Sequence, residues 1–170
     1  MTPPLGSRTG RPDQGPLTNP RAERVRQVAA LAARSARERS GRFLVEGPQA
    51  VREAVGFAAS SVRALYLSDE AVVRYPEIER AADEAHLPVR LGTPAVLDAM
   101  SADAQGVVAV LERTDPTMDS VLAVAPRLVA LLAHVRDPGN AGTVIRVADA
   151  VGADAVVVSE SSVDVHNPKV

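Results

Sequence analysis

The most constraining feature of the sequence is an apolar run that ends at a turn and is followed at once by a helical pattern. The run covers residues 128–135, the turn is Asp137-Pro138-Gly139-Asn140, and the helical pattern occupies residues 141–151. Apolar residues without alternation are typical of a strand buried on both faces of a parallel sheet. Unpaired N–H groups and the helix dipole favour negative charge at a helix N-terminus. The pattern therefore predicts a strand, a loop and a helix that together suit an anionic ligand.

A second apolar run, residues 155–158, follows this helix and predicts the next strand. Polar turn residues then lead to the last residue of the sequence, Val170. A β-α-β unit without a further crossover is too small to cover both faces of its sheet. We therefore expect the domain formed by residues 127–170 to be incomplete as given.

Residues 42–112 alternate short β-rich runs with helical patterns. The expected strands are residues 43–45, 62–67, 88–91 and 107–111, and the expected helices are residues 48–59, 76–85 and a short one that starts at Thr93-Pro94. This alternation predicts a compact α/β/α domain. Residues 113–126, which include a Thr-Asp-Pro-Thr sequence, are the expected linker to the second α/β domain.

The N-terminal part carries the positive charge of the chain. Residues 1–18 are rich in Pro, Gly, Ser and Thr and predict a flexible tail, and residues 19–41 predict a basic helix that Asn19 caps and Gly41 ends. The first 43 residues hold nine arginines and three acidic residues, a charge of +6, which leaves −8 for the remainder of a chain of net charge −2. Guanidinium groups bind phosphate in a bidentate manner, so this end suits a nucleic-acid backbone. A solvated helix face next to a basic tail is the alternative interpretation.

Composition excludes several classes of protein. The chain has 170 residues, of which 46% are hydrophobic, which is enough for a packed core. It contains no cysteine and three histidines without ligand spacing, so disulfides and cysteine nucleophiles are excluded and we expect no metal site. No apolar run reaches the roughly 20 residues of a membrane helix, and no signal peptide is evident. We therefore expect a cytoplasmic protein.

Three motifs are candidates for the loop and helix after the first apolar run. A dinucleotide fingerprint requires G-x-G-x-x-G directly after the strand, whereas the glycines stand at positions 139, 142 and 152. A phosphate loop requires G-x-x-x-x-G-K-[ST], which is absent. The remaining pattern is N-x-G-x-x-x-R-x-A-x-x-x-G, formed by Asn140, Gly142, Arg146, Ala148 and Gly152.

This pattern resembles motif 1 of the SpoU, or TrmH-like, RNA ribose 2'-O-methyltransferases of the SPOUT superfamily. Residues 162–170 are similar to the segment that follows the next strand of the family. Residues 43–47 and 105–110 resemble the two ends of the family's small substrate-binding domain, which has a fold like ribosomal protein L30e. The resemblance covers about residues 20–170, and the order and spacing of the motifs make it specific.

The resemblance implies an N-terminal L30e-like domain followed by the start of a parallel-sheet SPOUT, or α/β knot, domain. The family methylates ribose 2'-hydroxyls in structured RNA with S-adenosyl-L-methionine as cofactor, and the appended L30e-like domain favours 23S rRNA over tRNA as substrate. The family's C-terminal knot motifs, which build most of the donor pocket and the homodimer interface, do not occur here. We therefore expect donor-binding residues beyond Val170, and no activity from the 170 residues alone.

The resemblance maps the family's catalytic arginine onto Arg146, where it is thought to assist deprotonation of the 2'-hydroxyl. Asn140 of the same motif is expected to take part in the site by holding the loop that approaches the substrate. The residues themselves indicate only positioning and charge stabilisation, because guanidinium is too basic to be an ordinary base. The alternatives are an ion pair of Arg146 with Asp149 and a capping role for Asn140. Gly142, within the helix, predicts close approach of a ligand or another backbone, whereas Gly152 is expected to end the helix.

The expected RNA contacts are Arg24, Arg37, Arg39, Arg42, Glu46, Gly47, Gly142 and Lys169. A simple turn is the alternative for Glu46 and Gly47, and His134 is expected to be a core residue. Aromatic residues make up 2% of the chain, so RNA contact should depend on backbone and shape rather than base stacking. A non-catalytic RNA-binding module and a nucleotide-binding α/β protein without an RNA partner remain as alternatives to a methyltransferase.

Overall fold

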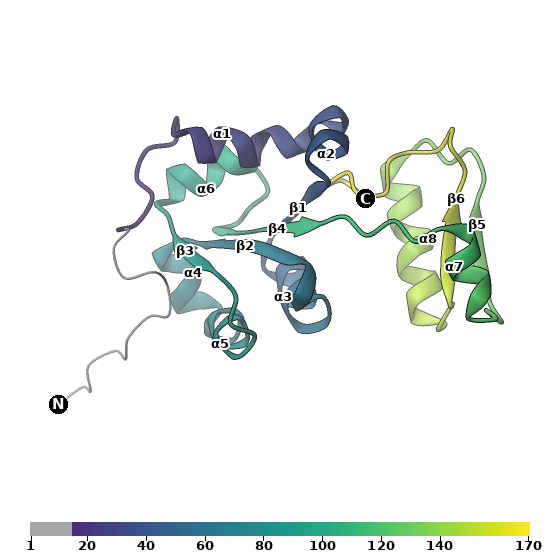
Figure 1. Cartoon of the computed structure of the whole chain (residues 1–170). Helices are drawn as coiled ribbons and strands as arrows, with labels where there is room; N and C mark the ends of the chain where they lie inside the picture. The colour runs from purple at the N-terminus through teal and green to yellow at the C-terminus, as the bar shows by residue number, and fades with distance from the viewer. Residues whose placement is uncertain (1–14) are drawn as a thin grey trace. The chain divides into compact units, whose positions relative to one another are not determined.

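The computed structural model describes residues 15–170, so most of the predicted tail, residues 1–14, lies outside the described residues. The chain divides into two compact units. The described part of unit 1 comprises residues 15–31 and 42–112, and unit 2 comprises Ala32–Gly41 and Arg113–Val170. Figure 1 shows the elements of both units along the chain.

Unit 1 is built on a four-stranded sheet with the order β1-β4-β2-β3. The strands are β1 (Arg42–Glu46), β2 (Val62–Leu67), β3 (Val89–Leu91) and β4 (Val107–Glu112). Strand β4 is antiparallel to both of its neighbours, whereas β2 and β3 are parallel. The central strand β4 is buried at every residue except its last, as expected for the middle of a covered sheet.

Helices cover both faces of this sheet (Figure 1). The helices α1 (Glu23–Ala29) and α6 (Pro94–Met100) contribute to one hydrophobic core, together with Val108 and Val110 of β4. The helices α3 (Pro48–Phe57), α4 (Asp69–Arg74) and α5 (Pro76–Glu84) contribute to the other, together with Val107, Ala109 and Leu111. The side chains of β4 thus alternate between the two cores. The predicted α/β/α layering is confirmed.

Two short elements of unit 1 were not predicted. Helix α4 is capped by Ser68, whose Oγ accepts a hydrogen bond of 3.0 Å from the Ala71 amide. A 3-10 turn, η2 (Ala59–Ser61), precedes β2. Both elements are too short for a hydrophobic period to be recognised.

The predicted single helix over residues 19–41 is wrong. The structure has α1, a 3-10 turn η1 (Ala30–Ala32) and a separate helix α2 (Arg34–Ser40), with the extended residue Ala33 between them. The carbonyl of Ala32 is left without a helical partner at this break and accepts a hydrogen bond of 2.8 Å from Arg37 Nη1. The break also divides the units, because α1 belongs to unit 1 and α2 to unit 2.

The start of the described chain also differs from expectation. Asn19 does not cap a helix, and its side chain accepts a hydrogen bond of 2.9 Å from the Arg21 amide in a turn. Leu17, placed in the predicted tail, forms an isolated bridge with Gly92. Its backbone donates to the Leu91 carbonyl at 2.8 Å, so the last tail residues are tied to the edge of the sheet.

Unit 2 contains the parallel strands β5 (Val129–Leu132) and β6 (Ala155–Val158), joined by helix α8 (Pro138–Ala150). In β5, only Leu132 is buried, and the Leu131 side chain is 69% exposed. The predicted strand over residues 128–135 is therefore shorter in the structure, and among the described residues it pairs with β6 alone. The expected linker holds a further helix, α7 (Met118–Ala123), capped by Thr117. A short helix within a Pro- and Thr-containing segment gives little sequence signal.

The described residues include no helix that is both long enough and apolar enough to span a membrane.

Candidate active site around helix α8

The candidate site begins at the N-terminus of α8. Asp137 caps this helix, because its Oδ1 accepts a hydrogen bond of 2.8 Å from the Asn140 amide, and Pro138 is the first helical residue. The helix thus starts three residues earlier than predicted, and the capping role proposed for Asn140 belongs to Asp137. An Asp-Pro pair before a helical pattern is the sequence signal that would have located this start. Asn140 lies in the first turn, and its side chain is exposed.

Arg146 lies two turns further along α8, and its guanidinium extends back toward the helix N-terminus. Its Nη2 donates to Thr143 Oγ1 at 3.3 Å, and the Thr143 hydroxyl in turn donates to the Gly139 carbonyl at 2.8 Å. Arg146 is exposed and, within residues 15–170, forms no ion pair with Asp149. The surface ion pair considered as the alternative is therefore absent from the described structure. The guanidinium presents donors to solvent beside the first turn of the helix.

Gly142 is the point where another part of unit 2 meets α8. A Cβ atom built on Gly142 would lie 1.9 Å from the Val170 carbonyl oxygen and 3.4 Å from Arg146 Nη1. A methyl group cannot fit at 1.9 Å from an oxygen, so only glycine allows this approach. The predicted close approach of a backbone at Gly142 is confirmed. Gly142 is buried by the contact and offers no surface to RNA.

The segment that reaches Gly142 is a series of turns after β6. The Asn167 amide donates to the Asp164 carbonyl at 2.9 Å, and the Asn167 side chain accepts from the Lys169 amide at 3.1 Å. The Val170 amide donates to the Asn167 carbonyl at 2.9 Å. The Lys169 side chain is exposed. These turns bring Lys169, Asn140 and Arg146 into one part of unit 2, with Val170 against the helix.

Hydroxyl groups fill the carboxyl ends of β5 and β6. Ser162 Oγ accepts a hydrogen bond of 3.1 Å from the Val135 amide and donates to the Leu132 carbonyl at 3.3 Å. Ser159 Oγ accepts from the His134 amide at 3.0 Å. These two hydroxyl groups, which follow β6, thus bind the backbone at the end of β5 and in the loop after it. No residue of residues 15–170 is assigned to the donor.

His134 is exposed rather than buried in the core. Its Nδ1 lies 2.6 Å from Ser161 Oγ, and its backbone has the left-handed φ of 56°. The core prediction for His134 is therefore wrong, because β5 ends at Leu132 and the histidine already belongs to the loop. Gly152 ends α8 as predicted, with φ of 70°.

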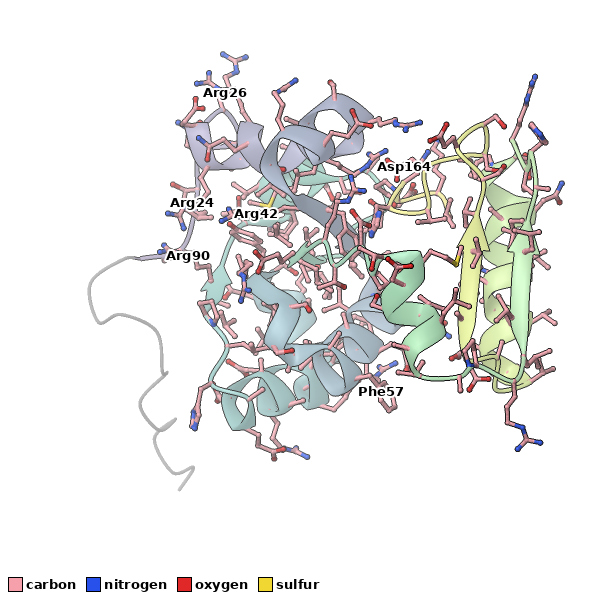
Figure 2. The ribbon with its side chains drawn as sticks, turned by 45° about the vertical axis from the view of Figure 1, so that its right-hand side comes forward. Arg24, Arg26, Arg42, Phe57, Arg90 and Asp164 are labelled. Atoms are coloured by element: carbon pink, nitrogen blue, oxygen red, sulfur yellow. The ribbon has the colours of Figure 1, made fainter. Side chains whose placement is uncertain are left out.

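The predicted RNA contacts of unit 1 divide into two kinds. Arg24 and Arg42 are exposed, and Figure 2 shows Arg24 and Arg26 extending outward from α1. Glu46 accepts a hydrogen bond from the Ser101 hydroxyl. Gly47 starts α3 with φ of 83° and donates to the Val107 carbonyl at 3.0 Å. The turn considered as the alternative thus accounts for the last two residues.

The two arginines predicted on the next helix also differ. Arg39 is exposed on α2. Arg37 is 2% exposed, and its Nε and Nη2 both donate to Asp164 Oδ2, at 2.9 and 2.8 Å. A guanidinium buried in this way cannot bind an RNA phosphate, so the expected RNA contact of Arg37 is wrong for this structure. Sequence spacing gave no signal of a partner 127 residues away.

Burial and charge perturb two groups next to Arg37. Burial raises the pKa of the Asp164 carboxyl, but hydrogen bonds from the His166 amide and Arg37 outweigh it, so the net pKa is below its usual value. The pKa of His166 is lowered, first by burial and then by the nearby Arg113 guanidinium, against the opposing charges of Asp115 and Asp164. The site therefore favours a charged Asp164 beside a neutral His166.

Comparison with known families and proteins agrees with the sequence motifs. Residues 22–109 match the MRM3-like substrate binding domain, and residues 127–170 match the SpoU rRNA Methylase family. The chain is 31% identical over 154 residues to the 23S rRNA (guanosine(2553)-2'-O)-methyltransferase RlmP of Bacillus subtilis, which covers 86% of this chain and 55% of that protein. It is 28% identical to the 23S rRNA (uridine(2479)-2'-O)-methyltransferase of Streptomyces viridochromogenes, over 90% of this chain and 54% of that protein.

Solved structures give the same result for the fold. The SpoU methyltransferase AviRb from Streptomyces viridochromogenes, solved in complex with AdoMet, has a TM-score of 0.69 and 27% identity, and the match covers 88% of this chain and 57% of that one. An rRNA methyltransferase from Sinorhizobium meliloti has a TM-score of 0.73 at 22% identity, with 91% and 58% covered, which supports the fold alone. The chain spans about half the length of the curated relatives it matches.

Both family matches occur in the order that the two units and their motifs require. The chain belongs to the SpoU rRNA methylase family and carries an MRM3-like substrate-binding domain in residues 22–109.

Proposed function

We propose that the gene product carrying this chain methylates a ribose 2'-hydroxyl in structured RNA, and that 23S rRNA is its substrate. The observation that carries the proposal is Arg146, an exposed guanidinium without an ion-pair partner in the described structure, held beside the first turn of α8. Relatives that align over most of this chain are named as 23S rRNA 2'-O-methyltransferases. An exposed arginine fits the 2'-O-methylation for which these relatives are named, because a ribose oxygen that loses its proton is stabilised by nearby positive charge.

In this proposal Arg146 binds the phosphate next to the target ribose and stabilises negative charge as the 2'-oxygen becomes a nucleophile. Its hydrogen bond to Thr143 and its place over Gly142 restrict the guanidinium to one side of α8. Asn140, exposed nearly two turns earlier on α8, orients the ribose. The role of Arg146 as the base that removes the proton rests on the family alone, since guanidinium holds its own proton too tightly.

The cofactor that we propose for the gene product is S-adenosyl-L-methionine, which supplies the methyl group when bound. The Ser159 and Ser162 hydroxyl groups after β6 are engaged by the backbone at the end of β5 and in the loop that follows it. We therefore place the donor site outside the residues described here and assign this chain the acceptor side of the reaction. Homodimer formation and a cytoplasmic location are part of the same proposal.

RNA binding in this proposal depends on exposed basic side chains. Arg24 and Arg42 in unit 1, and Arg39 and Lys169 in unit 2, are all exposed. Arginine and lysine contacts to phosphates release counterions, so binding should weaken steeply as salt increases. Glu46 and Gly47 shape the turn before α3 and support this surface without a direct contact.

A non-catalytic RNA-binding module is the second candidate. The engaged hydroxyl groups at the strand ends favour it for the 170 residues taken alone. In that case the chain binds RNA but the gene product leaves the ribose unmodified. Transfer RNA in place of ribosomal RNA is the variant of the first proposal that the same assay separates.

The test is to incubate the gene product with S-adenosyl-L-methionine and either 23S rRNA or tRNA, and to locate 2'-O-methylation by mass spectrometry and by resistance of the adjacent phosphodiester to alkali. We expect methylation of 23S rRNA at a single nucleotide. Salt-dependent RNA binding without methylation would support the second candidate. Methylation of tRNA alone would overturn the choice of substrate.

A further inference from the structure

The Arg37–Asp164 ion pair is buried within unit 2 and has no part in the proposed RNA surface. Arg37 is 2% exposed and Asp164 is 10% exposed. The pair joins α2 to the segment after β6, and both belong to unit 2. Figure 2 shows Asp164 on the loop that follows β6.

A buried ion pair of this kind adds little to the free energy of unfolding. Removing two charges from water costs as much as their attraction returns, and apolar side chains of similar volume often stabilise a protein equally well or better. What a buried pair does supply is a fixed geometry, because any displacement leaves a buried charge without its partner. Here the two donors of Arg37, Nε and Nη2, bind one oxygen, Asp164 Oδ2, at 2.9 and 2.8 Å.

The other oxygen of Asp164 holds the chain that follows it. Asp164 Oδ1 accepts a hydrogen bond of 3.0 Å from the His166 amide, and the Asp164 carbonyl accepts from the Asn167 amide at 2.9 Å. The Asn167 carbonyl then accepts from the Val170 amide, also at 2.9 Å. One buried carboxylate thus fixes the start of a continuous series of turns in residues 164–170.

These turns end at the candidate active site. The Val170 carbonyl lies against Gly142, at the place where the guanidinium of Arg146 passes over α8. Residues 164–170 contain no regular helix or strand, so sheet hydrogen bonds do not hold them in place. Their contacts are with Arg37 through Asp164 at one end, with Asp115 near His166 in the middle, and with Gly142 at the other end.

We propose that Arg37 is a positioning residue for methyl transfer: through Asp164 it holds residues 164–170 against α8 and so sets the place of Lys169 and Arg146 relative to the RNA. The inference rests on the proposed function. It assigns Arg37 a role other than RNA contact. Substitutions of an exposed arginine of α2, such as Arg39, and of the buried Arg37 should therefore have different effects.

The test compares three variants of the gene product: R37M, the double variant R37M/D164L, and R37K. R37M leaves the Asp164 carboxylate buried without its partner, so we expect a lower melting temperature together with lower activity. In R37M/D164L both charges are replaced by apolar side chains of similar size, so the melting temperature should return close to that of the unaltered protein. The kcat for methyl transfer should still be reduced, by about 10- to 100-fold, because displaced reacting groups lose orientation.

R37K keeps the charge but loses the two-donor geometry, so its kcat should lie between those of R37M and the unaltered protein. The KM for RNA should change much less than kcat in the double variant, because displacement of Lys169 weakens only one phosphate contact, whereas a positioning residue acts mainly on the chemical step. The amide hydrogens of Asn167 and Val170 should exchange faster in R37M/D164L than in the unaltered protein, because the turns that protect them are no longer held by Asp164.

The matched control is R34M on the same helix, which breaks an exposed ion pair with Glu38 and should change neither kcat nor exchange. A double variant that recovers kcat together with stability would overturn the positioning role and leave the pair as a structural feature. Unchanged exchange of residues 164–170 would overturn it as well. If the unaltered protein itself does not methylate RNA, the proposed function fails instead, which is a different result from a fully active double variant.

Discussion

Strand β4 of unit 1 and strand β5 of unit 2 differ in how they are covered. In unit 1, β4 lies between two strands, and helices pack on both faces of its sheet. All residues of β4 except the last are buried. In unit 2, β5 has one partner strand, and three of its four residues are not buried. Unit 1 therefore has two closed cores, whereas in unit 2 apolar side chains such as Leu131 and Val147 are exposed within a chain that spans about half the length of its relatives.

The comparison indicates where each unit gains its order. Burial of apolar side chains holds unit 1 together. In unit 2, polar contacts between residues far apart in sequence contribute more to holding the structure together. Arg37 binds Asp164, Ser162 binds the loop after β5, and the carboxylate of Asp154 accepts a hydrogen bond from the Leu128 amide. Residues with proposed chemistry lie in the second kind of environment, where loops carry function on a scaffold.

The largest difference in stability should appear when one leucine in each of strands β2 and β5 is replaced by alanine. L65A removes a fully buried side chain of β2 and should lower the free energy of unfolding of unit 1 by about 2–5 kcal/mol. In the 170-residue chain, L131A removes a side chain that is 69% exposed on β5 and should change stability by about 0.5 kcal/mol or less. Denaturant unfolding measures both, and equal losses would contradict the contrast between the two units.

The next effect tests the contact at Gly142. G142A places a methyl group 1.9 Å from the Val170 carbonyl oxygen, so the turns of residues 164–170 must move away from α8. We expect a loss of about 1–3 kcal/mol, as for other overpacked sites, together with reduced methyl transfer. The matched control is G139A in the same helix, where the nearest atom is a side-chain oxygen of Asp137 at 3.2 Å. Equal and small effects of both variants on hydrogen exchange in residues 164–170 would contradict the close approach.

A smaller effect concerns pH and should be confined to unit 2. The pKa of His166 is lowered from 6.5 by burial and by Arg113, so the unfolded chain binds a proton more readily than the folded one between the lowered value and 6.5. The stability of unit 2 should therefore be complete above about pH 6.5 and decrease as the pH falls below it. Hydrogen exchange across this range measures each unit separately, and H166Q should abolish the decrease.

Asp164 should respond only at lower pH. Its pKa is below the ordinary 3.8, so the stability that it contributes is present above that value and is lost as the pH falls through the lowered pKa. A decrease of unit 2 stability between pH 6.5 and 4 that persists in H166Q would contradict the assignment to His166.

The smallest effect should be a gain in unit 1. Gly56 lies within α3, and a Cβ there would meet nothing within 4 Å. G56A should therefore raise stability by about 0.5–1 kcal/mol through helix propensity and reduced freedom of the unfolded chain. Thermal melting measures the change, and a loss of stability would show that the α3 surface is more restricted than the structure indicates.

Unit 1 followed from its sequence more fully than unit 2 did. The four strands and the main helices were predicted because β-rich runs, Pro-initiated helices and turn residues are local signals. The break at Ala33 and the caps at Ser68 and Asp137 were missed, since they depend on how one turn of backbone is satisfied. The family motif gave Arg146, Asn140 and Gly142, and the structure supplied the reason for the glycine.

Arg37 illustrates what the sequence could not predict. It stands among exposed arginines at helical spacing, so charge alone placed it on the RNA surface. Its burial depends on a partner 127 residues away, and no local pattern marks such a pair. Likewise, the exposure of β5 depends on how many strands lie beside it, which a run of apolar residues does not reveal.

The central claim is that unit 1 contributes to RNA binding while α8 of unit 2 carries the chemistry. The most direct measurement compares RNA affinity and single-turnover methyl transfer for R24A/R42A and for R146A, with R80A on α5 as the control for loss of one charge. R24A/R42A should weaken RNA binding and reduce its dependence on salt, with the rate of bound complexes unchanged. R146A should lose one phosphate contact, and therefore only a small part of the RNA affinity, but about 100- to 1,000-fold in rate. A loss of affinity alone in R146A, with a normal rate at saturating RNA, would contradict the account.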